Sequence, residues 1–241
     1  MKLIVDIGNT KVKAAIFCEK KIVDFIVFDV FNLENLQNFI KNHKINYSIV
    51  SNVGNIDDAI INFLKSNFKN IELSFKVNLP FNIKYKTPET LGSDRIALAV
   101  GANLIYPNNN ILIIGTGTCI TYDFINSNNE YLGGAISPGL EMRFKALNNY
   151  TQNLPLISNY SDNNFNFIGN TTINSIYSGV VNGIAFEIDG FIDIYKVKYD
   201  YLKIFLTGGN ANFFENNLKN TIFANSNLIL NGLNEIIDLN T

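Results

Sequence analysis

The chain has 241 residues, 47% of them apolar, and 19 basic against 21 acidic side chains, a net charge of −2. That balance disfavours a nucleic-acid-binding module, because such modules carry a surplus of Lys and Arg. The single histidine, His43, all but excludes a catalytic histidine or a multi-histidine metal site. Cys18 and Cys119 are too far apart for a metal-binding pair, so we expect buried thiols in a reducing compartment.

The sequence contains 40 Asn, but they are interleaved with Ile, Phe and Leu, which favours a folded chain with a codon bias over a disordered tract. The opening run MKLIVDIGNT has too few apolar residues for a signal segment. No stretch approaches the apolar length of a membrane helix. We therefore expect a soluble, cytoplasmic protein with neither a membrane nor a nucleic-acid partner.

The first half predicts a β-hairpin followed by alternating helices and strands. Strands are expected over 3–5, 11–17 and 21–29, and the glycine and Asn-Thr after Asp6 provide the turn between the first two. The further elements expected from apolar periodicity are helices over 33–42, 57–67 and 90–106 and strands over 45–51 and 72–77. Pro107 and three Asn end the last helix and mark a domain boundary.

The pattern then restarts. A buried strand over 111–114 leads into the turn Gly-Thr-Gly-Thr at 115–118, as the first strand leads into its own glycine turn. The later elements expected are strands over 119–125, from 131 onward and over 201–206, and helices over 172–195 and 211–218. We interpret the repeat as an internal duplication with two α/β domains, 1–107 and 108–241.

Glycine-rich turns after strands expose backbone N–H groups that can bind phosphate oxygens. Asp6 stands at the mouth of the first turn, where a carboxylate would act through Mg²⁺, and Lys13 on the return strand could neutralise phosphate charge. The first turn alone favours an ordinary hairpin. The second turn at 115–118 indicates a nucleotide held between duplicated halves, and Thr-Gly-Gly at 207–209 is a third such turn, before a helix.

Further motifs identify a family. Gly-Ser-Asp-Arg at 92–95, Gly-Gly-Ala-Ile-Ser-Pro-Gly at 133–139 and the segment 169–179 with Thr172 follow one another in an order that resembles type III pantothenate kinases. That family belongs to the actin, Hsp70 and sugar-kinase superfamily. The resemblance implies an α/β fold of two duplicated ribonuclease H-like domains with an ATP cleft between them. The motifs cover nearly the whole chain.

The resemblance implies ATP-dependent phosphorylation of pantothenate to 4'-phosphopantothenate, the first step of coenzyme A biosynthesis, by a Mg²⁺-dependent homodimer. Asp94 would be the general base, Thr118 would contact ATP, and 207–211 would lie toward the nucleoside. The first ATP loop would consist of Asp6, Ile7, Gly8, Asn9, Thr10, Lys11, Val12 and Lys13, with Asp6 near the metal. The pantothenate pocket would consist of Tyr85, Gly92, Ser93, Asp94, Arg95 and Thr172, with Thr172 supplied by the partner subunit.

General chemistry supports Asp94 independently. A kinase that acts on an alcohol needs a carboxylate within hydrogen-bond reach of the hydroxyl, because the protein mainly positions the reactants and stabilises charge. Arg95 could bind a substrate carboxylate through two parallel hydrogen bonds. The plain alternative is that Asp94 caps the following helix and Arg95 is solvated.

The chain departs from the family at Gly115, which stands where an aspartate normally binds a monovalent cation, K⁺ or NH₄⁺. We therefore expect weak or no potassium dependence. Glu187, Asp189 and Asp193 share one predicted helix, and their spacing favours a solvated surface over a metal cluster. The glycines at 179 and 183 in that helix suggest close packing of another element, such as a helix across a dimer interface.

Two other functions stay open at this point. One is a kinase of the same fold that acts on another small alcohol or acid. The other is a non-catalytic, nucleotide-binding regulatory protein, toward which only Gly115 points, whereas the intact Asp6, Asp94 and Arg95 point against it. Release of ADP only in the presence of pantothenate would separate the catalytic from the regulatory alternative.

Overall fold

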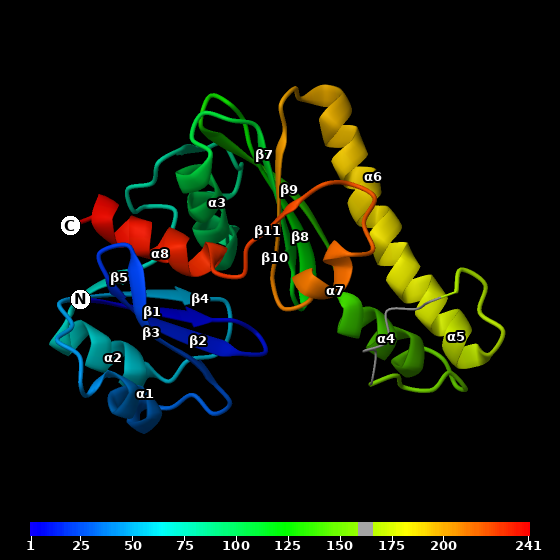
Figure 1. Cartoon of the computed structure of the whole chain (residues 1–241). Coiled ribbons are helices and arrows are strands. Elements are labelled where there is room, and N and C mark those ends of the chain that lie inside the picture. The colour runs from blue at the N-terminus through cyan, green and yellow to red at the C-terminus, as the bar shows by residue number, and fades with distance from the viewer. Residues whose placement is uncertain (159–165) are drawn as a thin grey trace. The chain divides into compact units, whose positions relative to one another are not determined.

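The computed structural model describes residues 1–158 and 166–241, which form two compact units (Figure 1). Unit 1 comprises Met1–Asn108, Ile125–Leu132 and Asn227–Thr241, and unit 2 comprises Asn109–Phe124 and Gly133–Ser226. Each unit contains part of an α/β fold built on mixed sheets, which confirms the predicted fold class. The end of the first segment at Asn108 lies next to the predicted boundary, but the C-terminal residues belong to unit 1.

Unit 1 contains a five-stranded sheet in the order β3-β2-β1-β4-β5. The hairpin strands β1, β2 and β3 are antiparallel, whereas β4 and β5 run parallel to β1. The elements of unit 1 are β1 Lys2–Ile7, β2 Val12–Cys18, β3 Lys21–Phe28, α1 Leu33–Ile40, β4 Tyr47–Asn52, α2 Asp58–Asn67, β5 Lys69–Glu72, β6 Asn82–Ile83, a 3₁₀ turn Pro88–Thr90, α3 Ser93–Ile105 and α8 Leu228–Leu239. The strand expected over 72–77 instead ends at Glu72.

The two faces of this sheet are covered by different helices (Figure 1). Leu3, Val5 and Ile7 of β1 form one apolar cluster with buried residues of α1 and α2. Because successive strand residues point to opposite faces, Ile4 and Asp6 face the other side, where α3 and α8 pack. Strand alternation thus directs Asp6 toward the face of the sheet that α3 covers.

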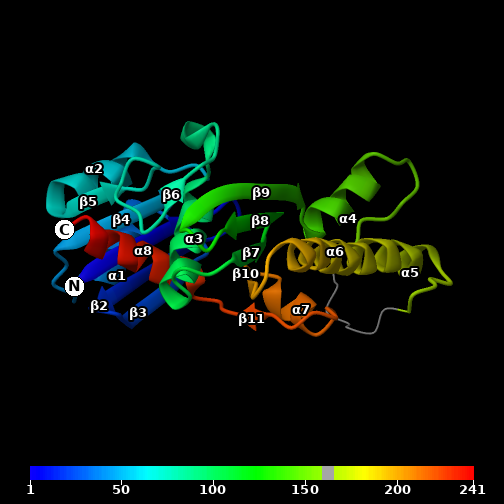
Figure 2. The same ribbon diagram turned by 90° about the horizontal axis from the view of Figure 1, so that it is seen from above.

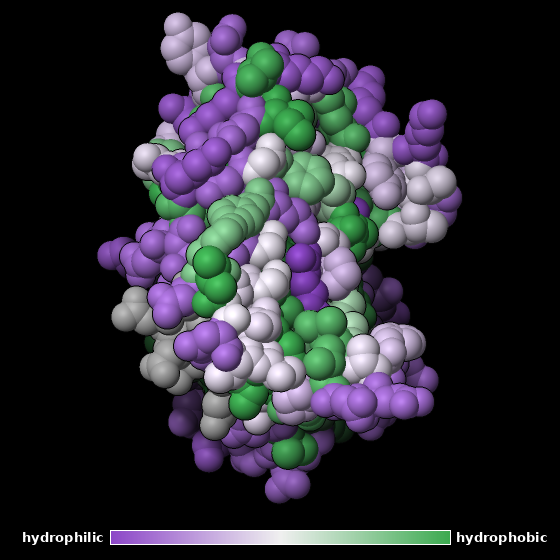
Figure 3. Space-filling model, turned by 90° about the vertical axis from the view of Figure 1, so that its right-hand side faces the viewer, coloured by the Kyte–Doolittle hydropathy of each residue, from purple (hydrophilic) through white to green (hydrophobic). Residues whose placement is uncertain are grey.

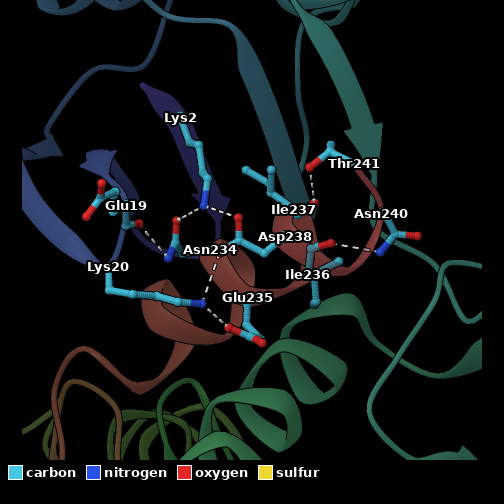
Figure 4. Close-up of polar contacts among 10 residues, drawn as sticks. All are labelled: Lys2, Glu19, Lys20, Asn234, Glu235, Ile236, Ile237, Asp238, Asn240 and Thr241. Carbon is cyan, nitrogen blue, oxygen red and sulfur yellow. Dashed lines mark hydrogen bonds and ion pairs between the residues drawn. The ribbon is translucent and has the colours of Figure 1, made fainter.

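Helix α8, which the sequence did not predict, closes unit 1. Its Gly232 lies so near α3 that a Cβ there would be 2.0 Å from the Ala97 carbonyl oxygen. Polar contacts fix α8 to the first strand (Figure 4): Lys2 Nζ of β1 donates to Asn234 Oδ1 at 3.2 Å and forms an ion pair with Asp238. Asn234 Nδ2 in turn donates to the backbone oxygen of residue 19 at 3.1 Å. The last helix of the chain is therefore an integral part of the first unit.

Unit 2 contains strands in the order β11-β10-β7-β8-β9, with β10 parallel to both β7 and β11. Its elements are β7 Ile111–Thr116, β8 Cys119–Ile125, β9 Glu130–Pro138, α4 Leu140–Asn149, α5 Thr172–Tyr177, a π-helical turn Ser178–Asn182, α6 Gly183–Lys198, β10 Lys203–Thr207, α7 Ala211–Glu215 and β11 Phe223–Ala224. The ends of β8 and β9 that meet at the 126–129 turn belong to unit 1, where β9 pairs with β6.

The core of unit 2 lies between the sheet and the rod formed by α5, the π-turn and α6 (Figure 2). Buried Leu112, Ile114 and Ile120 of the strands pack against Ile184 and Ile188 of α6. The predicted helix over 172–195 is confirmed in outline, since the rod runs on to Lys198 with one π-turn inside it. Helix α4 was not predicted. None of the helices in 1–158 and 166–241 combines the length and apolarity that crossing a bilayer requires.

Candidate active site

Asp6 is the last residue but one of β1 and lies beside two polar neighbours on the adjacent strands. Lys13 on β2 and Ser51 on β4 are its direct cross-strand partners. Burial, with a smaller contribution from the charge of Asp94, raises the pKa of Asp6 to about 6, while Lys13 and a hydrogen bond from Ser51 act to lower it. Oδ1 of Asp6 is buried and has no hydrogen-bond partner among the described residues. This oxygen can therefore accept a hydrogen bond from a bound ligand or coordinate a bound cation.

The first glycine turn is held in shape by backbone contacts. The Gly8 N–H donates to the Lys11 carbonyl at 3.1 Å, and the Val53 N–H donates to the Ile7 carbonyl at 3.0 Å. A Cβ on Gly54 would lie 2.8 Å from the Gly8 carbonyl oxygen. The segment after β4 can therefore approach the glycine turn this closely only because residue 54 has no side chain. No motif in the sequence singles out Gly54. Between Gly8 and Val12 the loop itself is exposed.

The start of α3 is locked to the end of β4 beside Asp6. Ser93 Oγ accepts the Asn52 N–H at 3.0 Å and lies 3.1 Å from Ser51 Oγ. Asp94 follows, and its Oδ1 accepts the Arg95 N–H at 2.8 Å. Burial raises the pKa of Asp94, and the hydrogen bond from the Arg95 backbone and the Arg95 charge oppose that rise. Ser51 thus contacts both Asp6 and Ser93, the residue before Asp94, and its place there depends on strand pairing that a single sequence does not reveal.

Arg95 is buried, with 6% of its surface exposed, so the alternative of a solvated arginine is wrong. Its guanidinium carbon lies 5.9 Å from the ring centroid of Tyr85, within the range of a cation–π contact. Tyr85 packs edge-on against Tyr131 with ring centroids 6.5 Å apart. The structure therefore brings together Tyr85, Arg95 and Asp94, three residues of the predicted pantothenate pocket.

In unit 2 the second and third glycine turns meet. The Asn210 N–H donates to the Thr116 carbonyl at 3.0 Å, and Thr116 Oγ1 donates to the Thr207 carbonyl at 2.8 Å. Gly208 has a φ of +101°, and a Cβ there would lie 2.7 Å from the Thr116 oxygen, so a side chain would be doubly unfavourable. The exposed Thr118 lies on the turn next to this junction. The two glycine-rich turns thus lie against each other in unit 2.

Other predicted residues lie elsewhere or behave differently. Thr172 is exposed at the first position of α5, in unit 2, whereas the other residues of the predicted pocket belong to unit 1. The expected solvated surface on α6 is wrong for Asp189, which is buried and accepts the Lys219 N–H at 3.1 Å. The expectation of buried thiols is wrong as well, because Cys18 is exposed and Cys119 half-buried. Both thiols are free.

The described residues contain no group of three or more His, Cys, Asp or Glu side chains placed to hold a metal ion. A metal at Asp6 would therefore rely on further ligands such as phosphate oxygens or water. Two open surface depressions lie at the end of β1 opposite Asp6 and are lined by residues such as Lys2, Tyr47 and Asp238. Neither depression gathers a set of groups comparable to those around Asp6 and Asp94.

The buried charge of Asp6 predicts a stability change on Asp6→Asn. Since the folded pKa is about 6, against 3.8 for an ordinary aspartate carboxyl, the ionised form costs about 3 kcal/mol at neutral pH. The variant should therefore raise the free energy of unfolding at pH 7.5 by about 1–3 kcal/mol. This gain should shrink as the pH falls through 6 toward 4, because wild-type Asp6 then becomes protonated in the folded state.

Urea unfolding at pH 7.5 and pH 4.5 measures this effect, with Asp29→Asn as the control at an exposed aspartate. The control should leave stability unchanged at both pH values. An Asp6→Asn protein that is less stable than wild type at pH 7.5 would contradict the predicted cost of the buried charge.

A family model and full-length relatives point to the same protein family. A family model described as Type III pantothenate kinase matches residues 2–194. The Type III pantothenate kinase of Flavobacterium johnsoniae is 46% identical, covering 98% of this chain and 96% of the relative. That of Christiangramia forsetii is 47% identical, covering 100% of this chain and 99% of the relative.

Solved structures show the same fold. A Campylobacter jejuni protein assigned to the Baf family of transcriptional activators is 24% identical with a TM-score of 0.63, covering 98% of this chain and 97% of that chain. A glucokinase from an Antarctic psychrotroph is 13% identical with a TM-score of 0.52, covering 98% of each chain. At these identities the likeness extends to the fold alone.

Proposed function

The chain belongs to the type III pantothenate kinase family, and from that membership we propose the residues through which it acts. It is an ATP-dependent kinase that phosphorylates pantothenate at the start of coenzyme A biosynthesis. The observation that best supports a catalytic assignment is the arrangement of Asp6, Ser51, Ser93 and Asp94, which holds two carboxylates beside each other at one edge of a sheet.

Asp94 is the general base in this proposal. It sits in the first turn of α3, and burial raises the pKa of its carboxyl toward the range in which a base is both ionised and able to take a proton. It would accept the proton of the pantothenate hydroxyl as the phosphoryl group is transferred. Arg95, stacked near Tyr85, would bind the pantothenate carboxylate, and Gly92 and Ser93 would line the same pocket.

We assign ATP to the two glycine-rich loops. The first, from Asp6 to Lys13, would contact the phosphates through the backbone N–H groups of its exposed turn, and Lys13 would offset their charge. Thr118 of the second loop would contact ATP, and the turn at 207–211 would lie toward the nucleoside. The contact between the Thr116 carbonyl and the Asn210 N–H supports a joint role for the last two.

The unpartnered Oδ1 of Asp6 fits a ligand of Mg²⁺, which prefers carboxylate and phosphate oxygens. Bound there, the ion would neutralise charge on the ATP phosphates. Within the chain itself, Ser51 and Lys13 hold the Asp6 carboxylate in place and favour its ionised form. Those contacts suit a carboxylate that must stay charged despite its burial.

We expect the rate to be largely independent of potassium. Gly115 lies buried inside β7 opposite Thr207 and has no side chain with which to hold a cation. Monovalent cations, like other hard cations, require oxygen ligands, and Gly115 supplies no side-chain oxygen. Replacing K⁺ by Na⁺ should therefore change kcat by less than roughly threefold. Steady-state rates in matched KCl and NaCl buffers measure this. A drop of roughly tenfold or more in NaCl would show that other oxygens replace the missing aspartate.

We propose a homodimer formed through α6. The outward side of the α5–α6 rod exposes Phe186, Ile194 and Val197, the last with 91% of its surface accessible, and apolar side chains interrupt the polar surface on that side (Figure 3). A Cβ at Gly179 or Gly183 would meet no atom within 4 Å, which leaves room for a partner helix. Thr172 at the start of the rod would then serve the partner subunit's pantothenate pocket. A sedimentation mass of 27.0 kDa would overturn the dimer.

The regulatory alternative and a changed substrate are distinguished by one assay. Purified protein with MgATP should release ADP only when pantothenate is added, and the phosphorylated product should appear in equal amount. Pantothenate-independent ADP release or nucleotide binding without turnover would favour the alternatives.

Both cysteines are free thiols and ATP is an intracellular substrate, and we therefore propose that the enzyme acts in the cytoplasm.

A further inference from the structure

Glu187 of α6 collects polar groups from three other elements of unit 2. Its Oε1 accepts the Tyr122 hydroxyl of β8 at 2.9 Å, and its Oε2 accepts the Ser137 hydroxyl of β9 at 3.1 Å. Arg143 of α4 forms an ion pair with the same Oε2. Both charged side chains are 22% exposed, so the pair is shielded from most of the solvent and stronger than a surface ion pair.

Arg143 also donates hydrogen bonds to the last two residues of β9. Its Nη2 donates to Ser137 Oγ at 2.9 Å, and its Nε donates to the Pro138 carbonyl at 2.8 Å. A guanidinium presents these donors in one rigid plane, which a lysine cannot reproduce. Arg143 and Glu187 therefore fix the direction of the segment Ser137–Gly139 through contacts with two of its three residues.

That segment touches the second glycine turn. The Gly139 N–H donates to the Thr118 carbonyl at 3.1 Å. A Cβ on Gly139 would lie 2.4 Å from the carbonyl oxygens of both Gly117 and Thr118, so the two backbones are in direct contact. A shift of Ser137–Gly139 would have to move the turn, since no flexible side chain lies between them.

We propose that Arg143 and Glu187 are positioning residues for ATP: they hold Ser137–Gly139 in place, and Gly139 holds the turn that carries Thr118. The inference rests on the proposed function, because it takes this turn as an ATP contact. Neither side chain touches the substrate in this account. Their effect reaches ATP through the backbone of Gly139 and Thr118, whereas pantothenate is bound by other residues.

Steady-state kinetics of Arg143→Gln and Glu187→Gln test the proposal. The KM for ATP should rise about tenfold in each, because displacing a binding group by a fraction of an ångström is enough for such a loss. The KM for pantothenate should stay within about twofold of wild type. Arg143→Lys should fall between Arg143→Gln and wild type, since it keeps the charge and loses the planar donors.

Two matched variants serve as controls. Lys145→Gln removes one positive charge from the same helix, where Lys145 forms an exposed ion pair with Glu141, and should leave the KM for ATP unchanged. Tyr122→Phe removes a contact of Glu187 that does not involve Ser137–Gly139 and should have much less effect than Arg143→Gln. Thermal unfolding of every variant separates a positioning effect from a loss of folded protein.

An unchanged KM for ATP in folded Arg143→Gln and Glu187→Gln would overturn the proposal, as would an equal rise in both KM values. If Arg143→Gln fails to fold, Glu187→Gln and Arg143→Lys decide between the two outcomes. Calorimetric binding of MgADP provides a readout that does not need turnover. Should wild type bind MgADP without pantothenate-dependent activity, the proposed function fails, while weaker MgADP binding by the variants would still support the positioning role.

Discussion

Asp94→Asn is expected to lower kcat by a factor of about 10³ while the protein stays folded, because general-base catalysis contributes 10²–10⁴-fold. Asparagine keeps the shape of the side chain and can still accept the Arg95 N–H through its Oδ1. It cannot take the proton of the pantothenate hydroxyl. The KM for pantothenate should change far less than kcat, since the substitution retains Tyr85 and Arg95 of the proposed pantothenate pocket.

The pH dependence provides a second readout of the same residue. Burial raises the pKa of Asp94, and the base must be ionised to act, so wild-type kcat should fall as the pH drops through that raised pKa. The residual activity of Asp94→Asn should lack this acidic limb. Asp58→Asn is the control, because Asp58 also lies in the first turn of a helix but is exposed. A variant that keeps more than about a tenth of wild-type kcat would rule out the base assignment.

Gly232→Val should destabilise the protein by about 3 kcal/mol or prevent folding, because overpacking a tight core forces the backbone apart. A Cβ at Gly232 would lie 2.0 Å from the Ala97 oxygen and 2.8 Å from the Gly101 nitrogen. Both atoms are backbone of α3, so no side chain can move aside. Helix α3 approaches the backbone of α8 just as closely, since a Cβ at Gly101 of α3 would lie 2.2 Å from the Leu228 carbonyl oxygen of α8.

Urea unfolding measures this change, with Asn231→Val as the matched control one residue earlier on α8. Asn231 is half-exposed, so the control tests the cost of a β-branched residue in the helix without the clash. A Gly232→Val protein as stable as Asn231→Val would mean that α3 and α8 can separate at little cost. The contact would then be incidental to the fold.

The periodic and turn-rich parts of the fold could be predicted from the sequence, and the tightly packed helices could not. Both hairpins followed from buried strands that flank glycine turns. Helix α8 was not predicted because Asn and Gly have low helix propensity. Two Asn and Gly232 lie within its 12 residues, and two more Asn flank it. The glycine is there because α3 approaches so closely, a reason that lies in a segment more than a hundred residues away.

The candidate site shows the same division. Asp6 and Asp94 could be named from their motifs, but Ser51 could not, because its place beside Asp6 depends on the pairing of β1 with β4. Glu187 was expected to be solvated because spacing along a helix says nothing about Arg143 and Ser137, which approach from other elements. Residues that act through contacts made by the tertiary fold carry no signal in a single sequence.

The late position of α8 in the chain has a consequence for biosynthesis. Ribosomes release residues in order, at about 5–20 per second, so α3 emerges on the order of ten seconds before the helix that covers it. Ten of its thirteen residues are buried in the finished protein. During translation this apolar surface has no α8 to cover it. The packing of α3, which carries Asp94, therefore cannot be completed until α8 has left the exit tunnel.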